Sequence, residues 1–454
     1  MAEWSNTKLS AVKENFGRFD AGYYRPVFLE TDNILSTINS TKLHSISSKI
    51  DVGHVGPMVR HYSEDGIPLL QTQNVREFFL DLDHTIRITS EFHSVLVKSQ
   101  VRKGNILIAR SGSFGSAAIF LEDEVVNSAD IIIVQIDDPE MEPLFIVTFM
   151  NTNHGVAQLI RFASGGVQGH VNLRMLEHFR VPVFKKPIQS AVSAIVQNAY
   201  EARKASMQAY AEARLLLESE LGLVKVRFKE PTGYEARFST VKLTDLFLFN
   251  RADAQCFAPS VLFYEQCLKD IGSGERLSVL LQTTVKGCRQ VETSKGWAPY
   301  CSIKHISGHE IVDASKCSPI PGTEFAAYED LLVAVTGATI GKVGIVKRYP
   351  RIAFSGDLLR LRVKDGVINP HYLLLVLEHT LAQVQFMRWI TGSTNGHLSP
   401  RDVGRIIVPR LNSTVEAKIA KLVEESLKER VESETLLKSA KARVEQLIEE
   451  AAKS

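Results

Sequence analysis

Two stretches decide the fold: GNILIARSGSFGSAAIF at 104–120 and EDLLVAVTGATIGKVGIV at 329–346. Each opens with a short run of apolar and β-branched residues and then reaches a glycine-rich turn. This is the pattern of a buried strand that ends in a turn. Because the second stretch repeats the first in residue type and order, we expect one strand-rich unit to occur twice in the chain.

The repeat extends well beyond these two stretches. The matched pairs that lie 227 residues apart are Ser128-Ala-Asp130 and Ser355-Gly-Asp357, Gly169-His170 and Gly396-His397, and Val181-Pro182 and Val408-Pro409. Near the start of each half, Asp20-Ala21 matches Asp253-Ala254, and residues 68–75 match 299–306. An offset that stays constant over so long a segment predicts a duplication.

A long helix is expected after each half. The first opens near Pro187, a favourable first-turn residue, and ends near Leu221, before Gly222. The second begins after Asn412 or Ser413. Apolar residues at alternating spacings of four and three predict a coiled coil, and the alternative is two amphipathic helices that each pack on their own domain. The expected helix-pairing residues are Ile188, Val192, Ile195, Val415, Ile419 and Leu422.

These patterns predict an α+β protein. Two tandem mixed α/β domains are expected, separated and followed by long helices that form an antiparallel coiled coil. The expected boundaries are 1–186 for the first domain, 187–222 for the first helix, 223–410 for the second domain and 411–454 for the second helix. The helices could pair within one chain or between two copies, and pairing within the chain is favoured because both halves are complete.

Composition and charge narrow the function. The chain is 44% hydrophobic and 23% charged, as in ordinary globular proteins. Its net charge is only +2, although residues 231–410 carry 21 basic and 16 acidic groups. A protein that binds DNA on its own needs a basic surface to contact the phosphates. The low net charge therefore argues against a stand-alone DNA binder, and partner subunits would have to supply part of any DNA clamp. The absence of a signal peptide and of a long apolar run predicts a cytoplasmic protein without membrane association.

The residues supply no plausible catalytic set and no metal site. The five cysteines, which form no CxxC pair and no zinc-type spacing with histidine, are Cys256, Cys267, Cys288, Cys301 and Cys317. The segment 337–342, GATIGK, has one residue too few between its glycines for a P-loop, and Val343 stands where Ser or Thr would bind magnesium. We therefore expect a protein that is not an enzyme and that binds no cofactor or metal itself.

The order of domains and helices resembles the specificity subunits of type I restriction–modification systems. The resemblance covers nearly the whole chain and rests on GNILIARSG, EDLLVAVTG, the Gly-His loops and the Val-Pro exits into each helix. It implies two target-recognition domains that read a bipartite, asymmetric site in double-stranded DNA, with the helices as a ruler between them.

The resemblance also implies partners. Two modification (methyltransferase) subunits would methylate adenine, and restriction subunits with translocase and nuclease activity would cut unmodified DNA in phage defence. S-adenosylmethionine, ATP and magnesium would be bound by these partner subunits.

Candidate DNA-reading residues are amide and basic side chains in loops, because Gln and Asn suit adenine while Arg and Lys suit guanine. In the glycine turns, a backbone amide could meet a phosphate. The expected DNA-binding residues are Arg60, Gln71, Gln73, Asn74, Arg110, Ser113, Gln168, His170 and Arg174 in the first domain, and Lys304, His305, Thr336, Lys342, Arg388, Asn395, His397 and Arg401 in the second. Each could equally be a solvated loop residue or form a local turn. The shared Gly-His loops could be framework.

Three other functions stay open. The chain could be the specificity subunit of another methylation-based phage-defence system, since partner genes define the system. It could be a coiled-coil interaction scaffold that binds no DNA, or, third, an enzyme of independent function. A continuous basic face would favour a DNA reader over a scaffold. The target sequence and the spacer length cannot be read from the chain.

Overall fold

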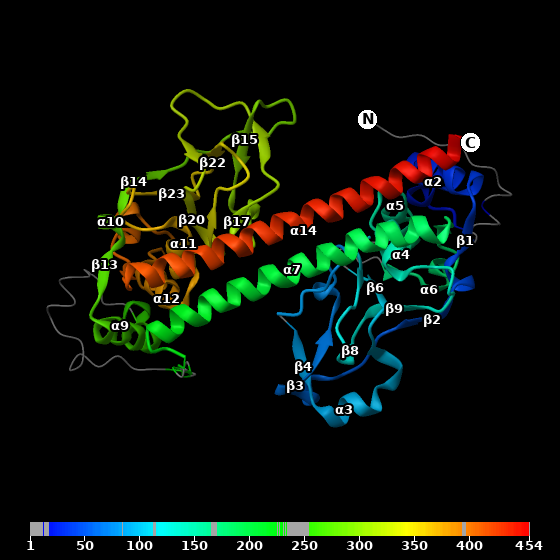
Figure 1. Cartoon of the computed structure of the whole chain (residues 1–454), viewed down its shortest axis with the longest axis horizontal. Coiled ribbons are helices and arrows are strands. Elements are labelled where there is room, and N and C mark those ends of the chain that lie inside the picture. Colours follow the sequence, from blue (N-terminus) through cyan, green and yellow to red (C-terminus); the bar gives the residue numbers. More distant parts are fainter. Residues whose placement is uncertain are drawn as a thin grey trace. The chain divides into compact units, whose positions relative to one another are not determined.

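The computed structural model describes residues 18–83, 85–111, 115–164, 170–224, 254–392 and 396–453, together with residues 12, 226, 228, 229, 231 and 233. The chain divides into two compact units: unit 1 is residues 1–203 with 431–454, and unit 2 is residues 204–430. Each unit holds one half of α7 (Lys186–Glu220) and one half of α14 (Ser413–Lys453), as Figure 1 shows. No helix among the described residues combines the length and the apolar character that a membrane crossing needs.

Unit 1 is built from small sheets and short helices. Its helices are α2 (Pro26–Thr37), α3 (Ser90–Val95), α4 (Pro143–Met150), α5 (Asn153–Phe162) and α6 (Leu173–Leu176). Its strands are β1 (Ser40–Lys42), β2 (Ser47–Val52), β3 (Tyr62–Leu70), β4 (Ile86–Ile88), β5 (Gln100–Val101), β6 (Ile106–Ala109), β7 (Ala117–Ile119), β8 (Val126–Ser128), β9 (Ile131–Ile136), β10 (Ala163–Ser164), β11 (His170–Val171) and β12 (Arg180–Pro182). The strand orders are β2-β9-β6-β7, β4-β3-β8-β5, β1-β12 and β10-β11.

Unit 2 follows the same plan. Its helices are α9 (Pro259–Ile271), α10 (Leu277–Leu280), α11 (Pro370–Glu378), α12 (Thr380–Trp389) and α13 (Pro400–Val403). Its strands are β13 (Gly274–Arg276), β14 (Leu281–Lys286), β15 (Ala298–Cys301), β16 (Ile306–Ser307), β17 (Glu310–Ile311), β18 (Ser315–Cys317), β19 (Phe325–Ala327), β20 (Leu331–Ala334), β21 (Val343–Ile345), β22 (Arg351–Phe354), β23 (Leu358–Val363) and β24 (Ile407–Pro409). The strand orders are β14-β23-β20-β21-β17-β16, β18-β15-β22-β19 and β13-β24.

The repeat in the sequence is therefore a repeat in topology. The sheet β2-β9-β6-β7 of unit 1 corresponds to β14-β23-β20-β21 of unit 2, and β4-β3-β8-β5 corresponds to β18-β15-β22-β19. The register is the same as well, because Ile106 pairs with Val134 in unit 1 and Leu331 pairs with Leu361 in unit 2. The predicted fold class, with two tandem mixed α/β domains and long helices, is confirmed.

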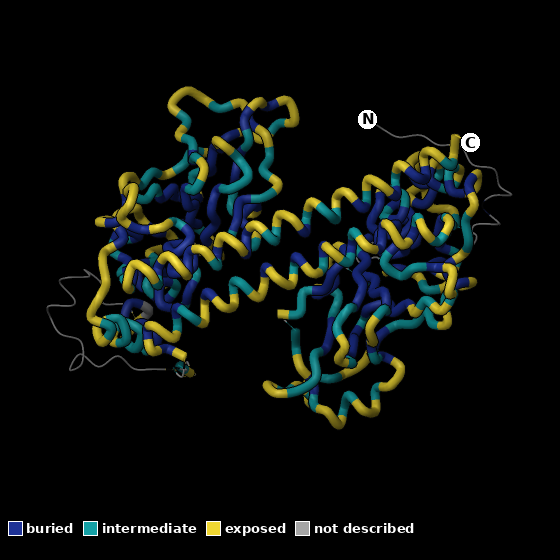
Figure 2. Tube along the Cα trace, in the orientation of Figure 1, coloured by how far each residue is buried: buried dark blue, intermediate teal, exposed yellow. Residues whose placement is uncertain are grey.

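The first sheet of each unit is buried on both faces. In unit 1, Ile106 and Ile108 pack into a core with α4, α5 and the helix pair, whereas Leu107 and Ala109 pack against the second sheet. Unit 2 repeats this arrangement with a core on each face of its first sheet. Figure 2 shows the buried residues of each unit as dark blue tube. Burial on both faces explains why these strands read as unbroken apolar runs instead of alternating ones.

Strand β23 alternates apolar and basic residues, a pattern typical of one buried and one solvated face. Arg360 is nevertheless only 6% exposed. The Arg360 guanidinium lies 3.3 Å from Glu324, and Arg362 binds the buried Asp330 with two hydrogen bonds of 2.8 and 2.6 Å. The second face of the strand is thus buried around ion pairs.

The segments 143–162 and 370–390 each form two helices. Thr152 caps α5 by accepting a hydrogen bond from the backbone N–H of Gly155, and His379 caps α12 in the same way at Leu381. A side chain at Gly155 would meet the carbonyl oxygen of Phe149 at 2.1 Å, so the tight corner requires glycine.

The two long helices pair antiparallel within the chain. In unit 1 the first half of α7 packs against the second half of α14, and in unit 2 the second half of α7 packs against the first half of α14. Ser433 donates a 2.7 Å hydrogen bond to the carbonyl of Ala199, and Ser206, 227 residues earlier, donates one of 2.7 Å to the carbonyl of Ser426. The repeat thus extends into the contact between the helices.

The predicted helix-pairing residues differ in burial. Val192 and Ile419 are fully buried, and Ile195, Val415 and Leu422 are partly buried against the same cores. Ile188 is half-buried and lies outside both cores. Since these cores also contain domain residues, the pairing role of the individual residues stays a prediction.

Candidate nucleic-acid interface

A hydroxyl and an aspartate meet where the glycine-turn strand of each unit ends. In unit 1, Ser111 Oγ donates to Asp130 at 3.3 Å, and in unit 2, Thr336 Oγ1 donates to Asp357 at 2.6 Å. Asp130 also binds the guanidinium of Arg110 at 2.6 Å. The predicted residues Arg110 and Thr336 are thus held by carboxylates at equivalent strand ends.

Unit 1 has a hollow of about 540 Å³ at this strand end. Gln71 and Gln73 lie in its wall with Arg76, Ser111 and Asp130, and its other lining residues are His54, Val55, Gly56, Met58, Thr72 and Ala129. The side chains of Gln71 and Gln73 are joined by a 3.3 Å hydrogen bond. Amide groups beside an exposed arginine can read base edges and hold a phosphate. Sequence reasoning missed Arg76 and His54, although Arg76 lies only two residues after Asn74.

Asn74 and His305 lie at equivalent positions, but both side chains are used inside their domain. Asn74 closes the 3-10 turn Thr72–Asn74 by accepting from the backbone N–H of Gln71 at 2.8 Å. His305 closes Ile303–His305 by accepting from the N–H of Ser302 at 2.9 Å. Both residues are buried, at 2% and 6% exposure. We therefore leave them out of the proposed DNA interface.

His305 gives a pH prediction. Burial lowers the pKa of His305, and the positive charge of Lys304 lowers it further. A protonated ring could no longer accept the hydrogen bond from Ser302. The unfolded chain takes up this proton near pH 6.5, so the stabilising contribution exists above about pH 6.5 and is lost as the pH falls through the lower folded pKa.

We expect His305→Asn to keep the turn, because Asn74 makes the same bond in unit 1. Denaturant unfolding from about pH 8 to about pH 5 should show a smaller loss of stability for His305→Asn than for the wild type. His305→Ala should cost about 1 kcal/mol at about pH 8 through loss of the cap. Equal pH dependence in the wild type and His305→Asn would contradict this role.

In unit 2 the residue that corresponds to Gln73 is Lys304. Its exposed ammonium pairs with Glu292 at 3.1 Å, and Glu292 also accepts a 2.8 Å hydrogen bond from Ser315. The two units thus present different chemistry at the same place, an amide in one and a cation in the other, as readers of different bases would.

The Gly-His loops are attached to the strand ends by backbone bonds. The N–H of Val171 donates to the carbonyl of Arg110 at 3.1 Å, and the N–H of Leu398 donates to that of Val335 at 2.9 Å. His170 and His397 themselves are exposed. The backbone of these loops fits the framework interpretation, and DNA contact by the two imidazoles stays a prediction.

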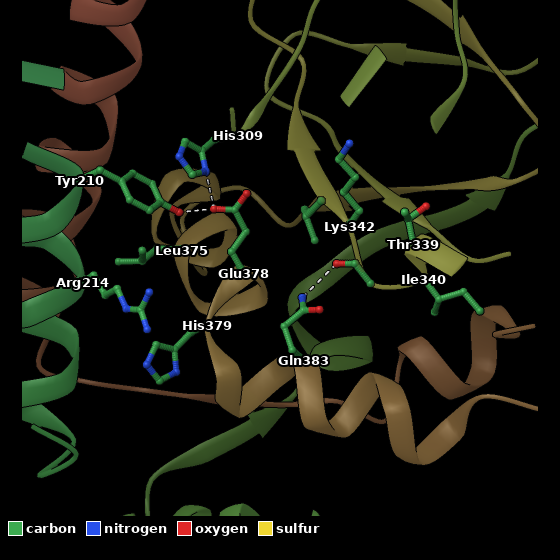
Figure 3. A pocket seen from close by; sticks show the side chains of 12 residues that line it. Tyr210, Arg214, His309, Thr339, Ile340, Lys342, Leu375, Glu378, His379 and Gln383 are labelled. Carbon is green, nitrogen blue, oxygen red and sulfur yellow. Dashed lines mark hydrogen bonds and ion pairs between the residues drawn. The ribbon is translucent and has the colours of Figure 1, made fainter. Parts of the chain in front are cut away.

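Lys342 lies in a hollow of about 480 Å³ at the unit 2 half of α7. There His309 stacks on Tyr210 with ring centroids 3.9 Å apart, and its Nδ1 lies 2.7 Å from the Glu378 carboxylate, which also binds the Tyr210 hydroxyl. Burial and the Glu378 charge raise the pKa of Tyr210 well above its ordinary value. Figure 3 shows Lys342 across the hollow from Tyr210, so this site joins the domain to its helix.

The other predicted residues are more scattered. Arg60 and Arg174 are exposed, and Arg401 lines a hollow of about 990 Å³ with Lys269, Arg276 and Arg405. Arg388 lines the same hollow as Arg401, but it is only 6% exposed and pairs with Glu265 at 2.8 Å, so its guanidinium is engaged within the domain. Ser113, Gln168 and Asn395 lie outside the described residues.

The cysteines are free thiols. Burial raises the pKa of the Cys301 thiol to about 12, which leaves it protonated at neutral pH. Within the described ranges, no group of three or more His, Cys, Asp or Glu side chains is placed to hold a metal ion.

No protein-family model matches the sequence, and no curated protein matches it. The structure is similar to the S subunit of a type I restriction-modification system from M. genitalium, at 14% identity and a TM-score of 0.45 over 91% of this chain and 96% of that one. It is also similar to the HsdS subunit from Thermoanaerobacter tengcongensis, at 13% identity and a TM-score of 0.29 over 91% and 95%.

Proposed function

We propose that this chain is the DNA-specificity subunit of a type I restriction–modification complex. The observation that carries the proposal is the duplication of one domain, in which each strand end pairs a hydroxyl with an aspartate while the neighbouring polar side chain differs, Gln73 in one copy and Lys304 in the other. A reader of a bipartite, asymmetric site needs two such domains with the same frame and different contact residues.

This function assigns a role to each domain, to the helices and to the partner subunits. The domains within 1–186 and 223–410 would be the target-recognition domains, and the helices at 187–222 and 411–454 would set the distance between the half-sites. Two modification subunits would methylate adenine and restriction subunits would cut unmodified DNA. Those partners would bind S-adenosylmethionine, ATP and magnesium in the cytoplasm, while this chain would supply no catalysis of its own.

The test is single-molecule sequencing of methylated adenine in a host that expresses this chain with its neighbouring methyltransferase gene. We expect a bipartite methylated motif that disappears when this chain is removed and that reveals both half-sites. Unchanged methylation without the chain, from a demonstrably active methyltransferase, would contradict the proposal and favour an interaction scaffold.

Gln71→Ala and Gln73→Ala test the strand-end site of unit 1. Each should weaken binding to the cognate duplex about tenfold, because a good bidentate amide contact contributes roughly 1–3 kcal/mol of base discrimination. The loss should concern one half-site only, so base changes in the other half-site should cost the variants as much as they cost the wild type.

The matched control is Gln135→Ala, since Gln135 is an exposed glutamine of unit 1 on β9, outside the hollow. Titration of labelled duplexes gives the affinities. If Gln71→Ala and Gln73→Ala behave like Gln135→Ala at both half-sites, these glutamines do not read DNA.

A further inference from the structure

Unit 2 carries a largely exposed tryptophan on its second sheet. Trp297, directly before β15, is 71% exposed and stacks on Phe325 of β19, with ring centroids 6.5 Å apart and 29° between the planes. The Arg351 guanidinium of β22 lies 3.7 Å from the centroid of the Phe325 ring. We call Trp297, Phe325 and Arg351 the aromatic platform.

The backbone holds this platform in place. Phe325 lies opposite Ala353 and packs with a small apolar cluster of strand residues, Ala298, Tyr300, Cys317 and Ala353. A side chain at Gly296 would lie 2.5 Å from the backbone of Cys317, so glycine lets the segment before Trp297 lie directly against β18. The indole is therefore positioned by the fold and still left in solvent.

The equivalent face of unit 1 is covered differently. There Phe92 of α3 packs with Leu69 and Ile88, and His61 stacks on Phe92 at 3.9 Å. Figure 1 shows α3 beside β3 and β4 in unit 1, and β15 and β22 of unit 2 away from the long helices. Among the residues that the structure describes, the apolar cluster on which Phe325 packs contains strand residues only, with no counterpart of Phe92 from a helix.

The surroundings of the aromatic platform are basic. Lys295 lies two residues before Trp297 and Lys316 lies opposite Pro299 of β15, and both are exposed, in addition to Arg351. The exposed Glu324, next to Phe325, pairs with Arg360. The nearby Glu292 is engaged by Lys304 and Ser315. Exposed aromatic rings among cations are the composition of surfaces that stack on nucleic-acid bases and hold the adjoining phosphates.

The aromatic platform also adjoins the proposed recognition site of unit 2. Glu292 lies in the segment before Trp297, and its carboxylate holds Lys304, the residue that corresponds to Gln73 in unit 1. This continuity, together with the positive charge, favours DNA over a protein partner for this surface.

We propose that Trp297 inserts at a base step next to the half-site that unit 2 reads. The indole would stack on an unstacked base, while Arg351, Lys295 and Lys316 would hold the flanking phosphates. Apolar wedges of this kind kink the duplex and enlarge the contact area. The inference rests on the proposed function and adds a DNA-distorting contact to it.

The test uses the full chain with its methyltransferase partner and a duplex that carries the methylated motif. The chain has three tryptophans, so the fluorescence difference between the wild type and Trp297→Phe isolates Trp297. We expect DNA to quench this difference signal, because bases quench a stacked indole. Trp297→Ala should weaken DNA binding about tenfold, and Trp297→Phe, which keeps an aromatic ring, should lose about threefold or less. The matched control is Val279→Ala, because Val279 is an apolar side chain of unit 2 that is 53% exposed and lies on α10, outside the aromatic platform.

Three outcomes are decisive. Quenching with a loss for Trp297→Ala but not for Val279→Ala supports the wedge. An unchanged signal and unchanged affinity, in a wild type that binds its motif specifically, overturns it. A loss of affinity for the methyltransferase in the absence of DNA overturns it too, because the surface would then be a protein-docking site. A wild type that reads no motif at all is a different result, since it fails the proposed function itself.

Discussion

Arg161→Met should lower the free energy of unfolding by about 3 kcal/mol. The Arg161 side chain is buried, its Nε donates to the carbonyl of Tyr23 at 3.0 Å, and its guanidinium pairs with Asp32 and lies 4.2 Å from the Tyr23 ring centroid. Loss of the Arg161 guanidinium leaves the Tyr23 carbonyl and the Asp32 carboxylate without this partner in largely apolar surroundings. The value is at the lower end for a buried ion pair because the Asp32 side chain is 40% exposed.

Denaturant unfolding followed by circular dichroism measures the effect. Arg60→Met is the matched control, because Arg60 is exposed and should change stability by no more than about 0.5 kcal/mol. In unit 2, Arg388→Met should act in the same direction, since Arg388 pairs with Glu265 at 2.8 Å. If Arg161→Met were as mild as Arg60→Met, the ion pair would not anchor α2 to α5.

The duplication in the sequence carries a signal for this pair. Arg161 and Arg388 are 227 residues apart, the offset that holds between Ser128–Pro182 and Ser355–Pro409. The same residue in both copies points to a shared frame, whereas readers of different bases should differ. The sequence alone predicts Arg388 as a DNA contact, because a charged residue at the end of an apolar helix looks the same in sequence whether it is solvated or paired. The structure pairs Arg388 with Glu265, and a DNA contact by this residue stays a prediction.

The converse rule, that residues which differ between the copies read DNA, has an exception. Gln73 and Lys304 differ between the copies and lie at the proposed site, as readers should. Asn74 and His305 differ as well, yet both only close a turn, because the amide oxygen and the ring nitrogen accept the same backbone hydrogen bond. A difference between the copies is thus necessary for distinct recognition but does not establish it.

What the sequence could predict was set by local signals. Strand runs, glycine turns and the spacing of apolar residues lie close together in the chain, and they predicted the fold class and the two long helices. The contact of His309 with Tyr210 and Glu378 joins segments far apart in sequence, and so does the stack of Trp297 on Phe325. Such contacts depend on strand order and register, which no local pattern determines.

Ser206→Leu should destabilise the pairing of α7 with α14 by about 3 kcal/mol. Ser206 is 8% exposed, its Oγ donates to the carbonyl of Ser426 at 2.7 Å, and it lies 3.2 Å from the Ser426 hydroxyl. The two backbones approach closely here because both side chains are small. A leucine both removes the hydrogen bond and forces the helices apart, whereas Ser206→Ala removes only the bond and should cost about 1 kcal/mol.

Ser219→Leu is the matched control, because Ser219 is an exposed serine of the same helix and should change stability by no more than about 0.5 kcal/mol. Unfolding followed by circular dichroism separates the three variants. Since Ser433 makes the equivalent bond to Ala199, Ser433→Leu should reproduce the loss in unit 1. If Ser206→Leu costs no more than Ser206→Ala, the helices have room for a larger residue at this point. The close approach would then have to be set by the apolar residues of α7 and α14 on either side of the serines.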